Sequence, residues 1–107
     1  MKISLIIPTY NRSEVLAETL EMALSQDYDD YEVIVVDQSC EAPKAVIERI
    51  EAAQGRARYL RTSPPNLPGA RNVGIRAAKG DLVVFIDDDV RIQSHYLTAH
   101  ARHYDDL

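Results

Sequence analysis

The most informative segment of the sequence is LVVFIDDD, which spans residues 82–89. Its first part, Leu82 to Ile86, is an unbroken apolar run, which is typical of a short strand with both faces buried. Three carboxylates follow without a spacer, and we refer to Asp87, Asp88 and Asp89 as the acidic triplet. The segment predicts a buried strand whose carboxyl end carries a cluster of negative charge.

Similar apolar runs upstream alternate with segments in which apolar residues recur at helical spacing. The runs predict further strands at residues 3–7, 33–36 and 59–61. The helical spacing predicts helices at residues 11–26, 43–55 and 70–78, and a last helix from about residue 94. Because parallel neighbours in a sheet need crossover connections, this alternation predicts an α/β fold: a mostly parallel, Rossmann-like sheet flanked by helices.

Local signals predict where some of these elements end. Pro8 closes the first strand, because proline cannot donate to a sheet ladder. Asn11, with Glu14 three positions later, resembles a capping box that starts the first helix. Residues 63–69 are rich in proline and other turn formers, and we expect a flexible loop there before the third helix.

Length and composition exclude several classes of protein. The chain has 107 residues, which suits one domain, and its 46% hydrophobic and 27% charged residues match an ordinary globular protein. A net charge of −5 makes nucleic acid an unexpected partner. The single cysteine, Cys40, forms no intrachain disulfide, and no apolar run approaches the ~20 residues that span a bilayer. We expect a cytoplasmic protein, which in a full-length form could lie peripherally at the inner face of the membrane.

Polar residues follow three of the predicted strands, at the edge of the sheet where ligands bind in open α/β folds. Residues 8–11 follow the first strand, Asp37 and Gln38 follow the second, and the acidic triplet follows the last. Parallel strands bring their carboxyl ends to the same edge. The sequence therefore predicts that these side chains converge on one site.

The acidic triplet indicates a divalent cation. Adjacent carboxylates repel one another unless a cation or hydrogen-bond donors compensate them. Mg²⁺ or Mn²⁺ is commonly held by one or two carboxylates together with substrate phosphates. On an extended chain Asp87 and Asp89 lie on one side and Asp88 turns away, which suits such a site. The alternative is a solvated acidic turn without a ligand.

Four segments together resemble the N-terminal, nucleotide-sugar-binding half of the family-2 glycosyltransferases of GT-A fold. They are IIPTYNR at residues 6–12, VIVVD at 33–37, ARNVGI with AAKGD at 70–81, and FIDDD at 85–89. The resemblance implies transfer of a sugar from a nucleotide diphosphate to an acceptor hydroxyl, with inversion at the anomeric carbon. UDP is the leading nucleotide, the acceptor is unknown, and Mg²⁺ or Mn²⁺ is the implied cofactor.

The resemblance also implies roles for individual residues. Thr9 and Asp37 would contact the base or ribose, and Arg71 would lie near the base or the phosphates. The acidic triplet would be the DXD motif, in which Asp88 reaches the ribose or sugar and Asp89 binds the metal. The expected donor-binding residues are Pro8, Thr9, Tyr10, Asn11, Asp37, Gln38, Arg71, Asp87 and Asp88, and the expected metal ligands are Asp89 and Asp87.

The sequence departs from the family pattern at two places. Gln38 stands where many relatives have a second acid that bonds the base, and an amide can both donate and accept there. The chain also stops at Leu107, whereas such relatives continue into an acceptor pocket with a catalytic base. We therefore expect residues 1–107 to be a truncated, donor-binding half, without the acceptor half, that binds donor without turnover.

Other interpretations remain open. A non-catalytic nucleotide-binding or self-associating module is the main alternative, because an exposed sheet edge could be covered by dimerisation. A phosphatase of haloacid-dehalogenase type also carries a nucleophilic Asp after an apolar strand, but there the motif usually opens the domain. A response-regulator-like receiver needs an acidic pair after the first strand, where this chain has residues 8–11.

Overall fold

A computed structural model describes residues 1–63 and 65–105 of the chain. Strands and helices alternate along it in the order β1 (Ile3–Thr9), α1 (Ser13–Leu24), β2 (Tyr31–Asp37), α2 (Lys44–Ala52), β3 (Ala57–Arg61), α3 (Leu67–Ala77), β4 (Leu82–Phe85) and α4 (Tyr96–Asp105). The strands of the described part form one sheet in the order β3-β2-β1-β4, and every neighbouring pair is parallel. The predicted α/β, Rossmann-like class is confirmed.

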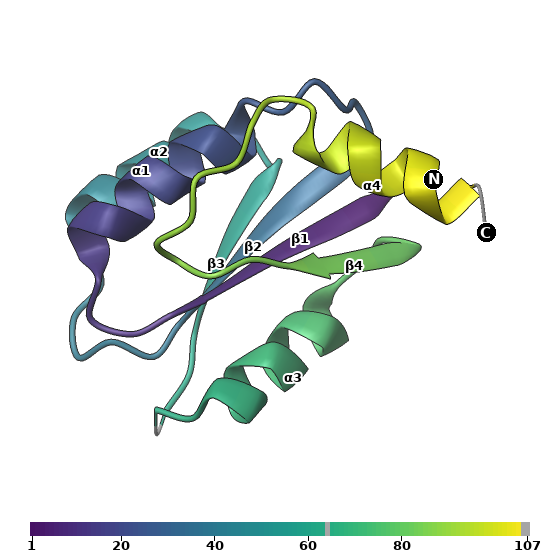
Figure 1. The fold of residues 1–107 in the computed structure, drawn as a ribbon. Helices are drawn as coiled ribbons and strands as arrows, with labels where there is room; N and C mark the ends of the chain where they lie inside the picture. The colour runs from purple at the N-terminus through teal and green to yellow at the C-terminus, as the bar shows by residue number, and fades with distance from the viewer. Residues whose placement is uncertain (64, 106–107) are drawn as a thin grey trace.

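Helices cover both faces of the sheet, which explains the unbroken apolar runs of β1 and β2. The predicted full burial of β4 is wrong, because β4 is an edge strand and Phe85 is exposed. In Figure 1, α1, α2 and α4 lie on one face and α3 on the other. Side chains of β1 alternate between the two faces. Leu5 and Ile7 join the core under α1, α2 and α4, whereas Ile6 packs with Ala70 under α3. Each of these side chains is buried, so neither face of the central strands tolerates a polar residue without a partner.

The first strand does not end at Pro8, as the sequence predicted, but continues to Thr9. Pro8 pairs in register with Val36 of β2, and β4 pairs with β1 only as far as Ile6. The Thr9 carbonyl accepts from the backbone N–H of Gln38, on the β2 side of the strand. Because successive residues of a strand direct their backbone polar groups to opposite sides, the Pro8 nitrogen faces the β4 side, beyond the residues of β4 that pair with β1. The missing N–H of proline therefore costs no ladder bond there.

The predicted capping box at Asn11 is wrong. Helix α1 begins after Arg12, and no side chain caps it. Asn11 instead has a φ of 53°, in the left-handed region that asparagine adopts more readily than most residues. Its N–H donates to Ser39 Oγ at 2.6 Å, and its side-chain oxygen accepts from the Cys40 amide at 3.2 Å. Asn11 thus ties the turn after β1 to the loop after β2.

The third helix begins earlier than predicted, inside the segment that we expected to be a loop. Asn66 caps α3, and its side-chain oxygen accepts from the Gly69 amide at 2.9 Å. Pro68 is compatible with the first turn of a helix, because the N–H groups there have no intrahelical partner. The last helix carries Leu97 fully into the core, as predicted.

A buried polar network holds the start of β4 at the amino edge of the sheet, opposite the predicted site. Glu32 accepts from Ser4 Oγ at 2.6 Å, from the Lys79 amide at 2.7 Å and from Arg58 Nη2 at 2.7 Å. Gly80 follows, and a β-carbon there would lie 2.7 Å from the backbone nitrogen of Ser4. Glycine is therefore required for this close approach of two backbones.

Among the described residues, no helix combines the length and the apolar character needed to cross a membrane.

Candidate functional site

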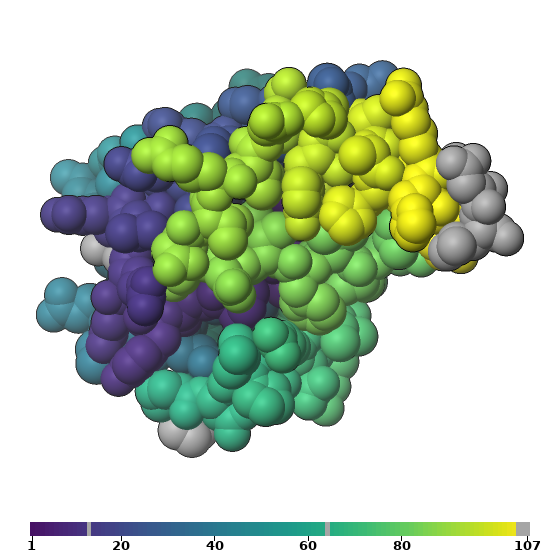
Figure 2. Space-filling view, in the orientation of Figure 1, coloured from purple at the N-terminus to yellow at the C-terminus, as the bar shows by residue number. Residues whose placement is uncertain are grey.

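A cleft opens at the carboxyl edge of the sheet. Figure 1 shows that α1 and α3 both begin at this edge. The volume of the cleft is about 510 Å³, within the range of about 300–1,000 Å³ typical of small-molecule sites. In Figure 2 the N-terminal segment, in purple, lies between the yellow-green segment that follows β4 and the teal start of α3. The lining residues come from these segments and from the end of β2: Pro8, Thr9, Tyr10, Arg12, Gln38, Pro65, Asn66, Leu67, Asp87, Asp88 and Asp89.

The middle member of the acidic triplet is buried and held from two sides. Thr9 Oγ1 donates to Asp88 Oδ2 at 2.7 Å. The hydroxyl of Thr19, on α1, donates to the Asp88 carbonyl at 2.8 Å. These bonds fix the backbone of the triplet against β1 and α1, and they supply the donor that a buried carboxylate needs.

The outer members of the triplet, Asp87 and Asp89, are exposed in the cleft. This alternation agrees with the predicted arrangement, in which Asp88 turns away from the other two. Asp89 Oδ2 lies 3.1 Å from Arg12 Nη1, and about half of each side chain is exposed. The cleft therefore holds an ion pair at its acidic end.

The donor set of the cleft suits a hard divalent cation only in part. Asp87 and Asp89 offer carboxylate oxygens, the ligands that Mg²⁺ and Mn²⁺ prefer. Within the described ranges, no group of three or more His, Cys, Asp or Glu side chains is placed to hold a metal ion. Two carboxylates fit a cation whose remaining ligands are phosphate oxygens and water, and they do not form an all-protein cage.

Asp37 lies at the end of β2 but outside the cleft lining, with no exposed surface. Its Oδ1 accepts from the Ser39 amide at 2.8 Å, and its Oδ2 accepts from the Tyr59 hydroxyl. Burial of Tyr59, together with the hydrogen bond to Asp37 and its negative charge, raises the pKa of the Tyr59 hydroxyl. Tyr59 therefore remains a hydrogen-bond donor at neutral pH. Contact of Asp37 with a nucleotide-sugar stays a prediction.

Gln38 does line the cleft, but its amide group binds the backbone of Asn66. Gln38 Nε2 donates to the Asn66 carbonyl at 3.0 Å, and Gln38 Oε1 accepts from the Asn66 amide at 3.0 Å. The side chain is buried. The Gln38 amide therefore binds the residue that caps α3. The sequence did not predict this contact.

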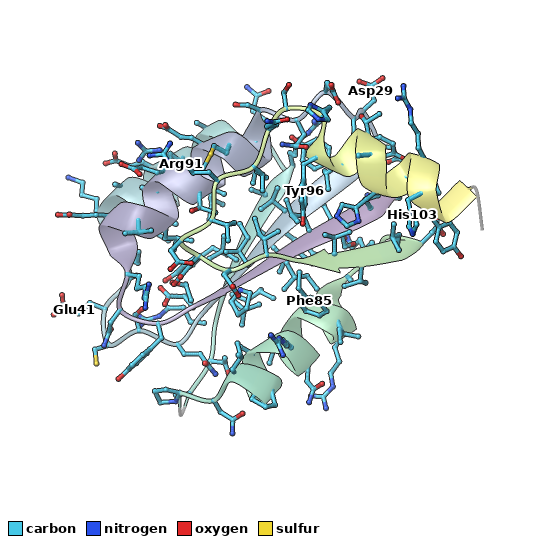
Figure 3. The ribbon with its side chains drawn as sticks, viewed as in Figure 1. Asp29, Glu41, Phe85, Arg91, Tyr96 and His103 are labelled. Atoms are coloured by element: carbon cyan, nitrogen blue, oxygen red, sulfur yellow. The ribbon has the colours of Figure 1, made fainter. Side chains whose placement is uncertain are left out.

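Two further predicted residues lie outside the cleft lining. Asn11 shapes the turn between β1 and α1, as described above. Arg71 is exposed on α3, and its guanidinium carbon lies 5.8 Å from the centre of the Phe85 ring. Figure 3 shows Phe85 on the side of β4 that faces α3. Arg71 is thus stacked on an aromatic ring, and its place near a donor stays a prediction.

The prediction missed four lining residues. Arg12 directly follows the predicted segment and could have been found as the first cation after β1. Pro65, Asn66 and Leu67 belong to the segment that we expected to be a flexible loop. An Asn followed by Leu-Pro is the signal of a capped helix start, and it places these residues at the same edge as the acidic triplet.

The parallel sheet, with an acidic cleft at its carboxyl edge, defines a Rossmann-like domain of the GT-A glycosyltransferase class. The family model described as "Glycosyl transferase family 2" matches residues 4–107. The chain belongs to this family, as the sequence motifs indicated.

Relatives of known name support this assignment. The chain is 33% identical over 102 residues to the GalNAc(5)-diNAcBac-PP-undecaprenol beta-1,3-glucosyltransferase of Campylobacter jejuni, covering 91% of this chain and 32% of that protein. It is 41% identical over 90 residues to the amylovoran biosynthesis glycosyltransferase AmsB of Erwinia amylovora, covering 80% of this chain and 30% of that protein.

Solved structures show the same fold. S. aureus TarS 1-349 in complex with UDP superimposes with a TM-score of 0.86 at 29% identity, over 99% of this chain and 32% of that one. The mannosyltransferase PcManGT of Pyrobaculum calidifontis, in complex with GDP-Man and Mn²⁺, gives a TM-score of 0.83 at 28% identity, over 94% of this chain and 31% of that one. The chain therefore spans about a third of the length of these proteins.

Proposed function

We propose that this chain is the nucleotide-diphospho-sugar-binding half of a metal-dependent glycosyltransferase, which transfers a sugar to an acceptor hydroxyl with inversion. The observation that carries the proposal is the convergence of the β1 end and the acidic triplet in one cleft of about 510 Å³. Support also comes from the TarS complex with UDP and the PcManGT complex with GDP-Man and Mn²⁺.

In this proposal Asp87 and Asp89 hold the cation, and the donor phosphates complete its ligand shell. The cation would neutralise the negative charge that develops on the leaving nucleoside diphosphate. Thr9 binds one oxygen of the buried Asp88, so Asp87 and Asp89 are the exposed carboxylates that can hold the cation, and contact of Asp88 with the ribose or sugar stays part of the proposal. Arg12 adds a positive group at the same end of the cleft, where a diphosphate would need one.

The nucleoside would lie against the uncharged side chains of the lining, which include Pro8, Tyr10, Pro65 and Leu67. Tyr10 and Leu67 are exposed large hydrophobic residues, and their surface is available to a ligand. UDP is the nucleotide that we propose first. We assign no catalytic base to the 107 residues, so the chain alone is proposed to bind donor without turnover.

Calorimetric titration of the chain with UDP, dTDP and GDP, each with and without Mn²⁺, tests the proposal. We expect one nucleotide to bind, with an affinity that depends on the metal. Absence of binding by a demonstrably folded chain would contradict the assignment. Equal binding with and without Mn²⁺ would contradict the metal but not the donor site.

A further inference from the structure

The Gln38 side chain joins the end of β2 to the residue that caps α3. Its two hydrogen bonds to Asn66, each 3.0 Å long, involve both the N–H and the carbonyl of that one residue. A primary amide supplies both the donor and the acceptor of this pair, whereas an ionised carboxylate has no hydrogen to donate. The side chain is buried, which makes the loss of either bond costly.

These two bonds of the Gln38 side chain go to the backbone of Asn66, and the Asn66 side chain has a separate role. Its oxygen accepts from the Gly69 amide at 2.9 Å and so caps the helix. Gln38 therefore holds the N–H and the carbonyl of Asn66, and α3 holds the Asn66 side chain and, through the Ala70 amide at 2.9 Å, the same carbonyl. Asn66 and Leu67 together form the wall that α3 contributes to the cleft.

The conformation of this wall depends on Gln38. Asn66 belongs to the connection between β3 and α3, where a segment without ladder bonds would sample several conformations. A ligand that binds only one of these conformations loses affinity in proportion to the fraction of molecules that adopt it. The amide pair raises that fraction before the ligand arrives.

We infer that Gln38 is a positioning residue of the donor cleft: it fixes the Asn66–Leu67 wall in its binding conformation and does not select the base. The inference rests on the proposed function of the cleft. It predicts that loss of the amide weakens binding of every nucleotide that uses this wall, by a similar factor.

The chain offers a matched control in Gln26, a second buried glutamine that holds backbone groups. Gln26 Nε2 donates to the Gln93 carbonyl at 2.8 Å, and Gln26 Oε1 accepts from the Leu97 amide at 2.9 Å. This clamp holds the start of α4 and does not line the cleft. Gln26→Met and Gln38→Met therefore make the same chemical change at two places.

The test combines two measurements on the wild type, Gln38→Met and Gln26→Met. Amide hydrogen exchange without ligand should show faster exchange at Asn66 in Gln38→Met only. Calorimetry with UDP, dTDP and GDP in the presence of Mn²⁺ should show about tenfold weaker binding in Gln38→Met, with the rank order of the nucleotides unchanged, and less than twofold change in Gln26→Met.

Three results would overturn the inference. In the first, Asn66 loses protection in Gln38→Met but nucleotide affinity stays at the wild-type value. In the second, affinity falls for one base only, which would make Gln38 a direct base contact. In the third, the wild type binds no nucleotide, which refutes the proposed function as well. The exchange data would then still show whether Gln38 holds the Asn66 backbone.

Discussion

Thr9 and Asp88 lie 79 positions apart in the sequence, yet the Thr9 hydroxyl donates a buried hydrogen bond of 2.7 Å to Asp88 Oδ2. This contact divides the acidic triplet into one inward carboxylate, fixed to β1, and two outward carboxylates that face the cleft. The split explains how three adjacent carboxylates coexist: one is compensated by the protein, and the others remain for a ligand.

Replacement of Thr9 by Val should therefore destabilise the fold, because the buried Asp88 carboxylate loses its donor while the side-chain volume stays nearly constant. We expect a loss of about 1–3 kcal/mol in the free energy of unfolding. Thr9→Ser keeps the hydroxyl and should lose less. Urea denaturation measures both variants, and equal stability of Thr9→Val and Thr9→Ser would show that the bond contributes little.

Replacement of Asp89 by Asn should weaken Mn²⁺-dependent nucleotide binding by at least about tenfold, because one of the two exposed carboxylates loses its charge. The fold should be unaffected, since Asp89 is exposed. Asp29→Asn makes the same change at an exposed position outside the cleft and serves as the control. Unchanged metal dependence in Asp89→Asn would refute the metal assignment.

Replacement of Arg12 by Gln should strengthen binding of Mn²⁺ measured without nucleotide. Arg12 pairs with Asp89 at 3.1 Å and so competes with a cation for the same carboxylate. Exposed ion pairs contribute about 0–1 kcal/mol, so the gain should not exceed about fivefold and stability should hardly change. Arg76→Gln, on the exposed side of α3, controls for net charge. The same gain in both variants would leave no specific role for Arg12.

Stability should fall on acidification through Glu32. Burial of Glu32 opposes its ionisation, but hydrogen bonds from Ser4, Lys79 and Arg58 outweigh burial and hold the pKa of Glu32 below its ordinary value. A carboxyl group whose pKa is lowered in the folded state stabilises the fold at pH values above its pKa in the unfolded chain. This stabilisation is lost as the pH falls through the pKa of the folded state.

Glu32→Gln tests this linkage by urea denaturation at several pH values. The variant should be less stable than the wild type at pH 7 by about 2 kcal/mol, because Arg58 loses its buried partner. The difference should shrink below about pH 4, where the unfolded chain takes up the proton. Glu41→Gln removes an exposed acid and should show a constant difference. A pH-independent deficit in Glu32→Gln would contradict the account.

The sequence predicted the fold because its main determinants are local or periodic. Unbroken apolar runs at β1 and β2 indicate a sheet covered on both faces, and the strand-helix alternation indicates parallel neighbours. The predicted strand end at Pro8 was wrong, because whether a strand can continue through a proline depends on where its neighbour stops pairing, here where β4 stops pairing with β1. Asn11 misled the prediction of the helix start, because its partners, Ser39 and Cys40, are remote in sequence.

The candidate site was predicted in outline but not in its internal contacts. Strand-end rules brought Thr9, Gln38 and the acidic triplet to one cleft. The same rules could not show that Gln38 binds the Asn66 backbone, because that contact depends on the path of the connection between β3 and α3. They also could not show that Asp37 is satisfied by Tyr59, which depends on the register of β2 with β3.

Amide chemical-shift mapping of the isotopically labelled chain with UDP and Mg²⁺ tests the central claim most directly, because it locates the ligand as well as detecting it. The account predicts the largest shifts at Thr9, Tyr10, Asn66 and the acidic triplet. Substitution of Mn²⁺ should broaden resonances most strongly around Asp87 and Asp89. Shifts confined to the groove of about 530 Å³ that Glu21, Arg49 and Arg56 line between α1 and α2, or no shifts at saturating UDP, would contradict it.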